Sequence, residues 1–334
     1  MAAAPADAVA LRLGLAVAIA LASAVAVLWV TGERTGVDYL VPGGAGPSAA
    51  VIEQDFGPGS APPGQPGYAG PQFYAIARYF PDLHAGAEHL DAPRYRLLRV
   101  LVPAVASLAP PGEATAAVLV ALNVFGLGLA CGATAALASR HGIPPAAGVA
   151  AGLPLLPALV VGTVEPVAFG LGLLGVSLAD RQRHGLAAVA FVTGALSREA
   201  VAVMALATGF GLCLAGIRHP RRLALYCIPA LAVVGWYFLL GRVVGGALPD
   251  RVDFLSMFNF AGATVALVLG MTALAALGAW LWRRSPAVWP IPALFALWTR
   301  FYFSGTFDWL ALTRVNAPAI GLALVRAFRM PDPP

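Results

Sequence analysis

The sequence predicts an all-α integral membrane protein with about ten transmembrane helices. Of its 334 residues, 59% are apolar and only 11% are charged, whereas soluble domains average about 45–50% and 25%. The mean hydropathy is +0.79, and apolar stretches of near-spanning length recur along the chain. These observations exclude a soluble enzyme. The net charge of +5 is not clustered, so we expect no nucleic-acid partner.

The first apolar stretch, residues 8–30, is interrupted only by Arg12. It is longer than the apolar region of a signal peptide and lacks a convincing cleavage site. We therefore expect it to be a retained transmembrane helix in a single membrane domain, residues 1–334.

Nine further apolar stretches follow a hydrophilic segment, and they cover most of residues 114–328. They are 114–138, 144–162, 164–180, 185–197, 200–216, 223–245, 260–281, 286–303 and 316–328. A span needs roughly 20 apolar residues, and several of these are shorter. The number of spans therefore needs a second criterion.

The placement of Arg supplies that criterion. Basic junctions at 139–142, 181–184, 218–222, 283–284 and 326–329 alternate with acidic junctions at Glu165, Glu199, 250–253 and Asp308. Short cytoplasmic loops collect basic residues. The alternation predicts ten spans, with both termini in the cytoplasm and most acids on the outer face.

Residues 185–216 test this count. A single helix there would be about 48 Å long, well beyond a hydrocarbon core of about 30 Å. It would also place Arg218, Arg221 and Arg222 outside. We therefore predict two short helices that meet at residues 197–199.

Residues 31–113 form the only large hydrophilic segment, which we expect to be an outer loop. Residues 41–71 are rich in Gly and Pro and predict an irregular linker. Residues 72–80 predict a short amphipathic helix at the membrane interface. The apolar run 96–108 is too short to span, so we predict a re-entrant or interfacial helix with Arg96 and Arg99 on one face.

Several charged residues lie close to the predicted hydrocarbon core of the membrane. Placing a charge there costs free energy, so these residues are expected to have a structural or functional role. They are Glu165, Arg198, Glu199 and Arg314. Two interpretations remain open. Ion pairs such as Glu165 with Arg198 could fix helix ends, or the charges could line a cavity for an anionic lipid headgroup, since Arg binds phosphate with two hydrogen bonds.

The histidines of the loop do not indicate a metal. His84 and His89 lie near acidic residues, but their spacing matches no zinc site. A hydrated loop surface is the simpler explanation, and no metal ligands are assigned. A role for a divalent metal is left open.

Two loop segments resemble a known family. Residues 67–77 (GYAGPQFYAIA) resemble the GYDGQFYYxxA signature of bacterial membrane proteins similar to GT-C glycosyltransferases, and residues 91–103 (DAPRYRLLRVLVP) resemble their LDxPxYRYQRxxYP segment. Residues 164–166 (VEP) and 196–200 (LSREA) follow in the order of the DLTEP and LTRET motifs. The resemblance covers roughly residues 60–205.

The resemblance implies a many-helix fold in the bacterial plasma membrane with a catalytic first outer loop. It implies inverting transfer of a sugar from a polyprenyl-phosphate donor to a glycan, lipid or protein acceptor on the extracytoplasmic face. A loop carboxylate would take the acceptor proton, and Arg side chains would hold the leaving phosphate. Membrane lipids are the other expected partners, and no cofactor is implied.

Two departures from the family pattern affect the assignment of the base. The Asp of GYDG is Ala69 here, and the Asp of DLTEP is Gly162. We take Asp55 as the first candidate base, with Asp38 and Asp91 as alternatives. The candidates for binding substrate or phosphate are Arg96, Arg99, Arg198, Arg314, Glu165, Glu199, Gln72 and Tyr74.

Two other functions are compatible with the sequence. A non-catalytic lipid-binding or assembly protein would have kept the fold and lost the base. A transporter would show internal repeats, but the two halves of this chain show none.

Overall fold

The computed structural model describes most of the first 244 residues. The described residues are 6–32, 34–41, 43–64, 69–160, 162–217 and 219–244, with Ser285, Ala287, Val288, Pro290, Ile291 and Leu322. Every regular element within these ranges is a helix, so the predicted all-α class is confirmed. The predicted spans 260–281, 286–303 and 316–328 lie almost wholly outside the described residues, as does Arg314.

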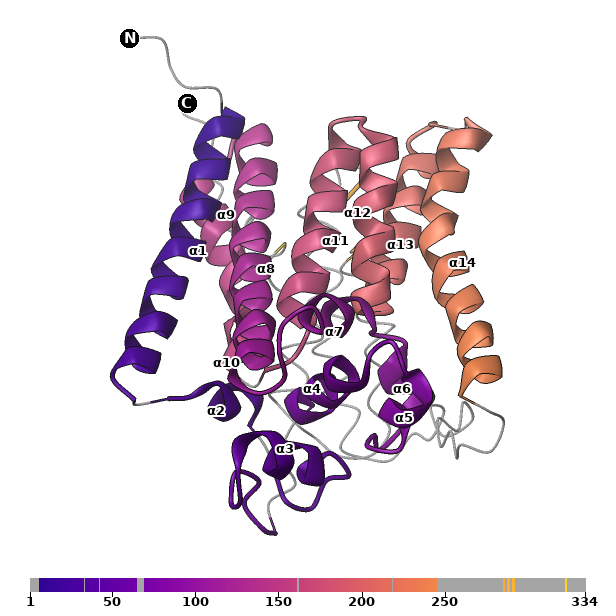
Figure 1. Cartoon of the computed structure of the whole chain (residues 1–334). Helices are drawn as coiled ribbons and strands as arrows, with labels where there is room; N and C mark the ends of the chain where they lie inside the picture. The colour runs from indigo at the N-terminus through magenta and orange to yellow at the C-terminus, as the bar shows by residue number, and fades with distance from the viewer. Residues whose placement is uncertain are drawn as a thin grey trace, which may run out of the picture.

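In the described part of the chain, three helices are long and apolar enough to cross a membrane: α1 (Ala6–Val30), α8 (Glu113–Arg140) and α14 (Pro220–Val243). They match the predicted spans 8–30, 114–138 and 223–245. Figure 1 shows α1 and α14 at opposite sides of a layer of roughly parallel helices.

Shorter helices lie between α8 and α14 along the chain. They are α9 (Pro145–Gly152), η1 (Leu153–Leu155), α10 (Leu156–Val160), α11 (Glu165–Asp180), α12 (His184–Ser197) and α13 (Ala200–Leu214). The predicted break at 197–199 is confirmed, because α12 ends at Ser197 and α13 begins at Ala200. The predicted span 144–162 is instead divided into three pieces around Pro154 and Pro157, which lack a backbone N–H for a continuous helix.

Small residues bring α8 and α11 into backbone contact. A Cβ added at Gly170 would lie 2.3 Å from the carbonyl oxygen of Gly126, and one added at Gly126 would lie 2.4 Å from the Val167 nitrogen. Glycine at such contacts lets helices approach closely. The pairs α1 with α8 and α11 with α12 also pack side by side.

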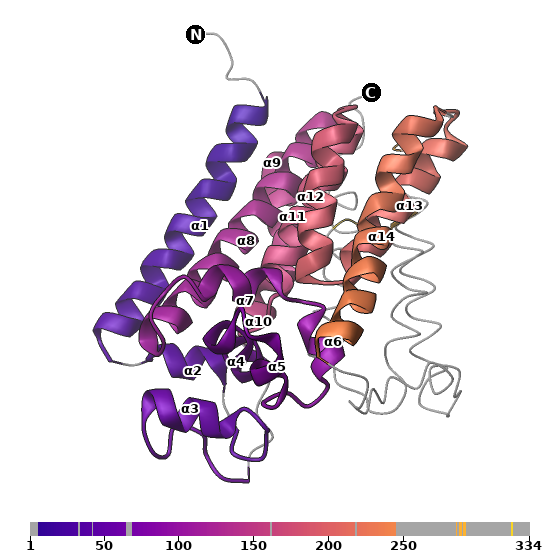
Figure 2. The same ribbon diagram turned by 45° about the vertical axis from the view of Figure 1, so that its right-hand side comes forward.

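Residues 31–112, which we call the loop domain, fold across one end of the helix layer (Figures 1 and 2). Six short helices form it: α2 (Gly36–Leu40), α3 (Ala49–Phe56), α4 (Gly70–Tyr79), α5 (Leu83–Ala87), α6 (Pro93–Leu97) and α7 (Leu101–Ala106). Buried side chains of the loop domain, such as Phe73, Ile76 and Leu97, join Leu119 of α8 in one hydrophobic cluster.

The loop domain corrects three predictions. Residues 41–71 are not simply a linker, because α3 buries Val51 and Ile52 in the hydrophobic cluster. The helix predicted at 72–80 is present as α4, but it begins earlier, at Gly70, and its residues 70–77 are buried. The single helix predicted over 96–108 is wrong, because α6 and α7 are separate. Pro103 would clash with the carbonyl of Arg99 in a continuous helix.

Candidate functional site

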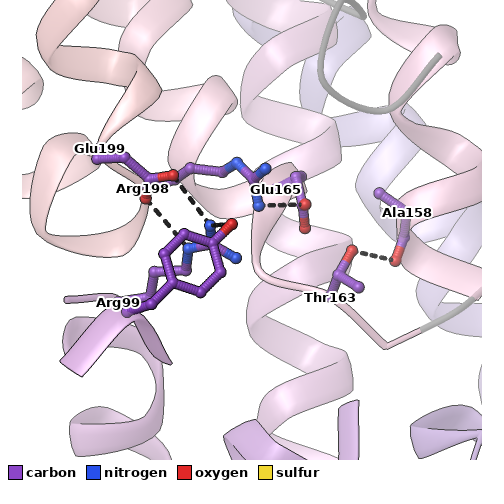
Figure 3. A network of polar contacts seen from close by, with 7 residues as sticks. Arg99, Ala158, Thr163, Glu165, Arg198 and Glu199 are labelled. Atoms are coloured by element: carbon purple, nitrogen blue, oxygen red, sulfur yellow. Dashed lines mark hydrogen bonds and ion pairs between the residues drawn. The ribbon is translucent and has the colours of Figure 1, made fainter. Parts of the chain in front are cut away.

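A buried ion pair joins the loop domain to the helix layer. Arg99 lies between α6 and α7, and Glu199 lies between α12 and α13, 100 residues later. The Arg99 guanidinium donates two hydrogen bonds to the Glu199 carboxylate, at 3.1 Å and 2.9 Å (Figure 3). The Arg99 side chain is only 2% exposed. This two-point geometry is the strongest form of an Arg–carboxylate pair.

A second buried pair lies beside the first. Arg198 precedes Glu199 in the chain, and its Nη1 lies 2.5 Å from Oε1 of Glu165, with both side chains 3% exposed. The ion pair considered from sequence is therefore present (Figure 3). We call Arg99, Glu165, Arg198 and Glu199 the junction cluster; its formal charges sum to zero.

The local backbone explains why these charges meet. Arg198 adopts an extended conformation, with φ −160° and ψ 125°, which ends α12. Its side chain and that of Glu199 reach partners on different elements as a result. Glu165 lies in the first turn of α11, where the helix dipole favours a negative charge.

Tyr95 completes the surroundings of Arg99. The guanidinium carbon lies 4.2 Å from the centre of the Tyr95 ring, a cation–π contact, and Arg99 also donates to the Tyr95 hydroxyl. Burial alone would lower the pKa of Arg99, but Glu199 raises it above its usual value. Burial would likewise raise the pKa of Glu199, but Arg99 and Arg198 lower it. Both members of this pair are therefore charged at neutral pH.

Asp55, the first candidate base, belongs to a separate group within the loop domain. Its Oδ2 accepts hydrogen bonds from the Tyr74 hydroxyl at 2.7 Å and from Nε of Arg78 at 3.0 Å. The Tyr74 oxygen in turn accepts from the backbone N–H of Gly112 at 2.6 Å. Burial and Asp55 both raise the pKa of Tyr74, which keeps its hydroxyl protonated. The group links α3, α4 and the segment before α8.

Asp91, Gln72 and Arg96 form a third group. Two nitrogens of Arg96 lie 2.8 Å from the two carboxylate oxygens of Asp91, and Nε2 of Gln72 donates to Oδ2 at 2.8 Å. The backbone N–H of Asp91 donates back to Gln72 at 3.3 Å. Three predicted site residues thus meet, although the Asp91 side chain is 42% exposed and already paired with an Arg.

Asp38 lies apart from these groups. It occupies the third position of α2 and accepts hydrogen bonds from the backbone N–H and the hydroxyl of Thr35, at 2.6 Å and 2.8 Å. The bond from the Thr35 backbone N–H to the Asp38 carboxylate is the acidic half of a capping box, so the exposed carboxylate has a local structural role.

The structure also explains one departure from the family pattern. Gly162 has a φ of +64°, and a Cβ there would lie 2.2 Å from the Tyr39 carbonyl oxygen. No acidic side chain fits at this position. Ala69, in contrast, is the residue immediately before α4 and is half-buried.

Two residues of these groups were missed from the sequence. Arg78 follows Tyr74 by four positions, and Tyr95 precedes Arg99 by four. Residues at this spacing lie on one face of a helix. The spacing could therefore have identified Arg78 from the sequence. It could not have identified Tyr95, because α6 ends at Leu97, between Tyr95 and Arg99.

Comparisons with known proteins complete the description of the site. Searches against protein-family models, curated proteins and solved structures each found no match. Within the part of the chain that the structure describes, no group of three or more His, Cys, Asp or Glu side chains is arranged to hold a metal ion.

Proposed function

We propose that the protein is a membrane glycosyltransferase of the GT-C type, which uses a polyprenyl-phosphate sugar as donor. The junction cluster is the observation that carries the proposal. Three buried charges and the largely buried Glu199, 12% exposed, lie where the loop domain meets the helix ends. Burying ion pairs adds little to stability, and ionisable groups within membrane proteins usually mark a binding or transport site.

The proposal includes the finer topology: ten helices in a bacterial plasma membrane, both termini cytoplasmic, and the loop domain outside. The donor phosphate would bind Arg99 and Arg198, replacing part of the hydrogen bonding now supplied by Glu199 and Glu165. Arg binds a phosphate with the same two-point geometry as a carboxylate. Positive charge there stabilises the phosphate as its negative charge grows.

The transfer would proceed in one displacement. The acceptor hydroxyl oxygen forms a bond to the anomeric carbon while the bond from that carbon to the phosphate oxygen breaks. The hydroxyl proton passes to a carboxylate, and the bonding electron pair leaves with the polyprenyl phosphate. Asp55 is the first candidate for the carboxylate. The hydrogen bonds from Tyr74 and Arg78 both go to its Oδ2, so they do not engage Oδ1, which would take the proton.

The test uses the purified full chain in lipid nanodiscs with a panel of polyprenyl-phosphate sugars and measures release of polyprenyl phosphate. Asp55→Asn should lower the rate about 100-fold or more, as loss of a general base does. Glu53→Gln, an exposed change on the same helix α3, should leave the rate unchanged. No release with any donor would reject the proposal.

A non-catalytic lipid-binding or assembly protein is the second candidate. Ala69 stands where the resembled motif has its carboxylate, and Asp55 is already held by Tyr74 and Arg78. Ala69→Asp separates the two candidates. Turnover that appears only in this variant supports the non-catalytic function of the native chain, whereas similar turnover in the native chain excludes it.

A further inference from the structure

A buried histidine and tyrosine join α12 to α14 at the end of α12 that is opposite the junction cluster. His184 is the first residue of α12, and Tyr226 lies in the second turn of α14. Nδ1 of His184 lies 2.7 Å from the hydroxyl oxygen of Tyr226. The two residues are only 7% and 1% exposed. A polar contact buried this deeply depends on its hydrogen bond, because an unsatisfied buried group is destabilising.

The partners of the His184 ring determine its tautomer. Nε2 lies 3.1 Å from Oε1 of Gln182, and an amide oxygen can only accept a hydrogen bond, so Nε2 carries a proton. Nδ1 of the neutral ring is then an acceptor, and the Tyr226 hydroxyl donates to it. Among the described residues, no second acceptor for that hydroxyl is found. The observed contact therefore requires a neutral His184.

Packing holds the tyrosine in place. A Cβ added at Gly209 of α13 would lie 2.7 Å from the Cβ of Tyr226, so α13 comes close to this side chain. The ring of Phe191 on α12 meets the Tyr226 ring edge to face, with ring centres 6.1 Å apart. The His184 ring does the same at 6.0 Å. Tyr226 is thus held by α12 and α13 together.

Three physical factors oppose protonation of His184. Burial and the positive charge of Arg222 on α14 both lower its pKa. The ring also lies at the N-terminus of α12, where the helix dipole disfavours a positive charge.

Other titratable groups lie at the same end of the elements packed on α12. On α11, α13, α14 and the turns beside them, the described ones are Asp180, Arg181, Arg183, Cys213, His219, Arg221 and Cys227. Asp180 is the acid in this set, and its Oδ2 lies 2.7 Å from Nε of Arg140 and 3.4 Å from Nε2 of His141. Its negative charge is therefore directed to those two side chains, and Arg222 is the charge that acts on His184.

We propose that the contact between His184 and Tyr226 is a pH-sensitive switch, which holds α12 against α14 while the ring is neutral and releases them when it is protonated. A protonated ring has N–H donors at both nitrogens, so Nδ1 can no longer accept from Tyr226, and a second positive charge appears near Arg222. In the proposed topology this end faces the cytoplasm, so the switch responds to cytoplasmic acidification. It does not depend on the proposed transferase activity.

Nuclear magnetic resonance tests the protonation step. The full-length chain carries isotope-labelled histidine in lipid nanodiscs, and the His184 signal is identified by its loss in His184→Gln. We expect a neutral ring with its proton on Nε2, and a titration midpoint below the ordinary value of about 6.5. Arg222→Gln should raise the midpoint, Arg222→Lys should retain it, and Arg221→Gln, at the neighbouring exposed arginine, should leave it unchanged. A midpoint at or above the ordinary value would overturn the proposal.

Electron paramagnetic resonance tests the opening step by measuring the distance between two spin labels. One label is attached to the native Cys227 on α14 and the other to Leu186→Cys on α12, both exposed positions, after the other two cysteines are replaced by Ala. The distance should lengthen as the pH falls through the His184 midpoint.

Two histidine variants show whether His184 causes the opening. His184→Gln should abolish the lengthening, because its amide oxygen accepts from Tyr226 at every pH. His219→Gln, at the exposed histidine before α14, should leave the lengthening intact. A distance that does not change while His184 titrates, or a change that persists in His184→Gln, would exclude the switch.

Discussion

Arg99 and Glu199 form a buried ion pair whose contribution to stability can be measured at the scale of single residues. Removing one partner leaves a buried charge, which costs about 3–5 kcal/mol. Arg99→Met should therefore lower the free energy of unfolding by about that amount in a denaturant titration. Arg99→Met with Glu199→Leu should recover most of the loss but not any lipid-phosphate release. A single variant as stable as the native chain would contradict the burial of the pair.

Asp91 gives a second prediction at this scale, through its pH dependence. Burial would raise its pKa, but the hydrogen bonds from Arg96 and Gln72 lower it below the usual value. A carboxylate with a lowered pKa in the folded state stabilises the fold above its unfolded pKa, which is about 3.9. That contribution is lost as the pH falls below this value and through the folded pKa.

The difference in stability between the native chain and Asp91→Asn should therefore be largest near neutral pH and shrink below about pH 4. Thermal unfolding at a series of pH values measures it. If the stability difference between the native chain and Asp91→Asn does not change with pH, the pKa of Asp91 is not lowered in the folded chain.

At the scale of elements, α8 and α11 depend on glycine for their contact. Gly170→Ala would place a methyl group 2.3 Å from the Gly126 carbonyl, and such overpacking costs about 1–3 kcal/mol. Gly235→Ala on α14 is the matched control, because nothing lies within 4 Å of its added Cβ. The control should be neutral, or stabilising by up to about 1 kcal/mol. Unfolding free energies of both variants decide the point.

At the scale of the whole molecule, polar contacts join the loop domain to the helix layer. The indole N–H of Trp236 on α14 donates to the Leu97 carbonyl of α6 at 2.9 Å. Trp236→Phe removes this bond, worth about 1 kcal/mol. Hydrogen exchange should then become faster in α6 and stay unchanged in α3, which packs on α4. Uniformly faster exchange would indicate general destabilisation.

The sequence by itself determined the positions of the longer helices in the described chain. Apolar runs and the Arg-rich junctions placed α1, α8 and α11 to α14 nearly to the residue, including the break at residues 197–199. These signals are local, because hydropathy and chain length decide where a helix can lie in a membrane. The sequence was less informative within the loop domain, where α3 owes its existence to burial of Val51 and Ile52.

Only the tertiary structure decided which charges meet. Arg99 and Glu199 are 100 residues apart, and nothing in their local sequence distinguishes that pairing from one with Arg96 or Glu165. The partners are selected by the way the loop domain packs on the helix ends. Asp55 was the first candidate base in the sequence, with Asp38 and Asp91 as alternatives, and the fold gives the three carboxylates three different sets of donors. The sequence determines which side chains the protein carries, but contacts between distant residues form only when the chain packs.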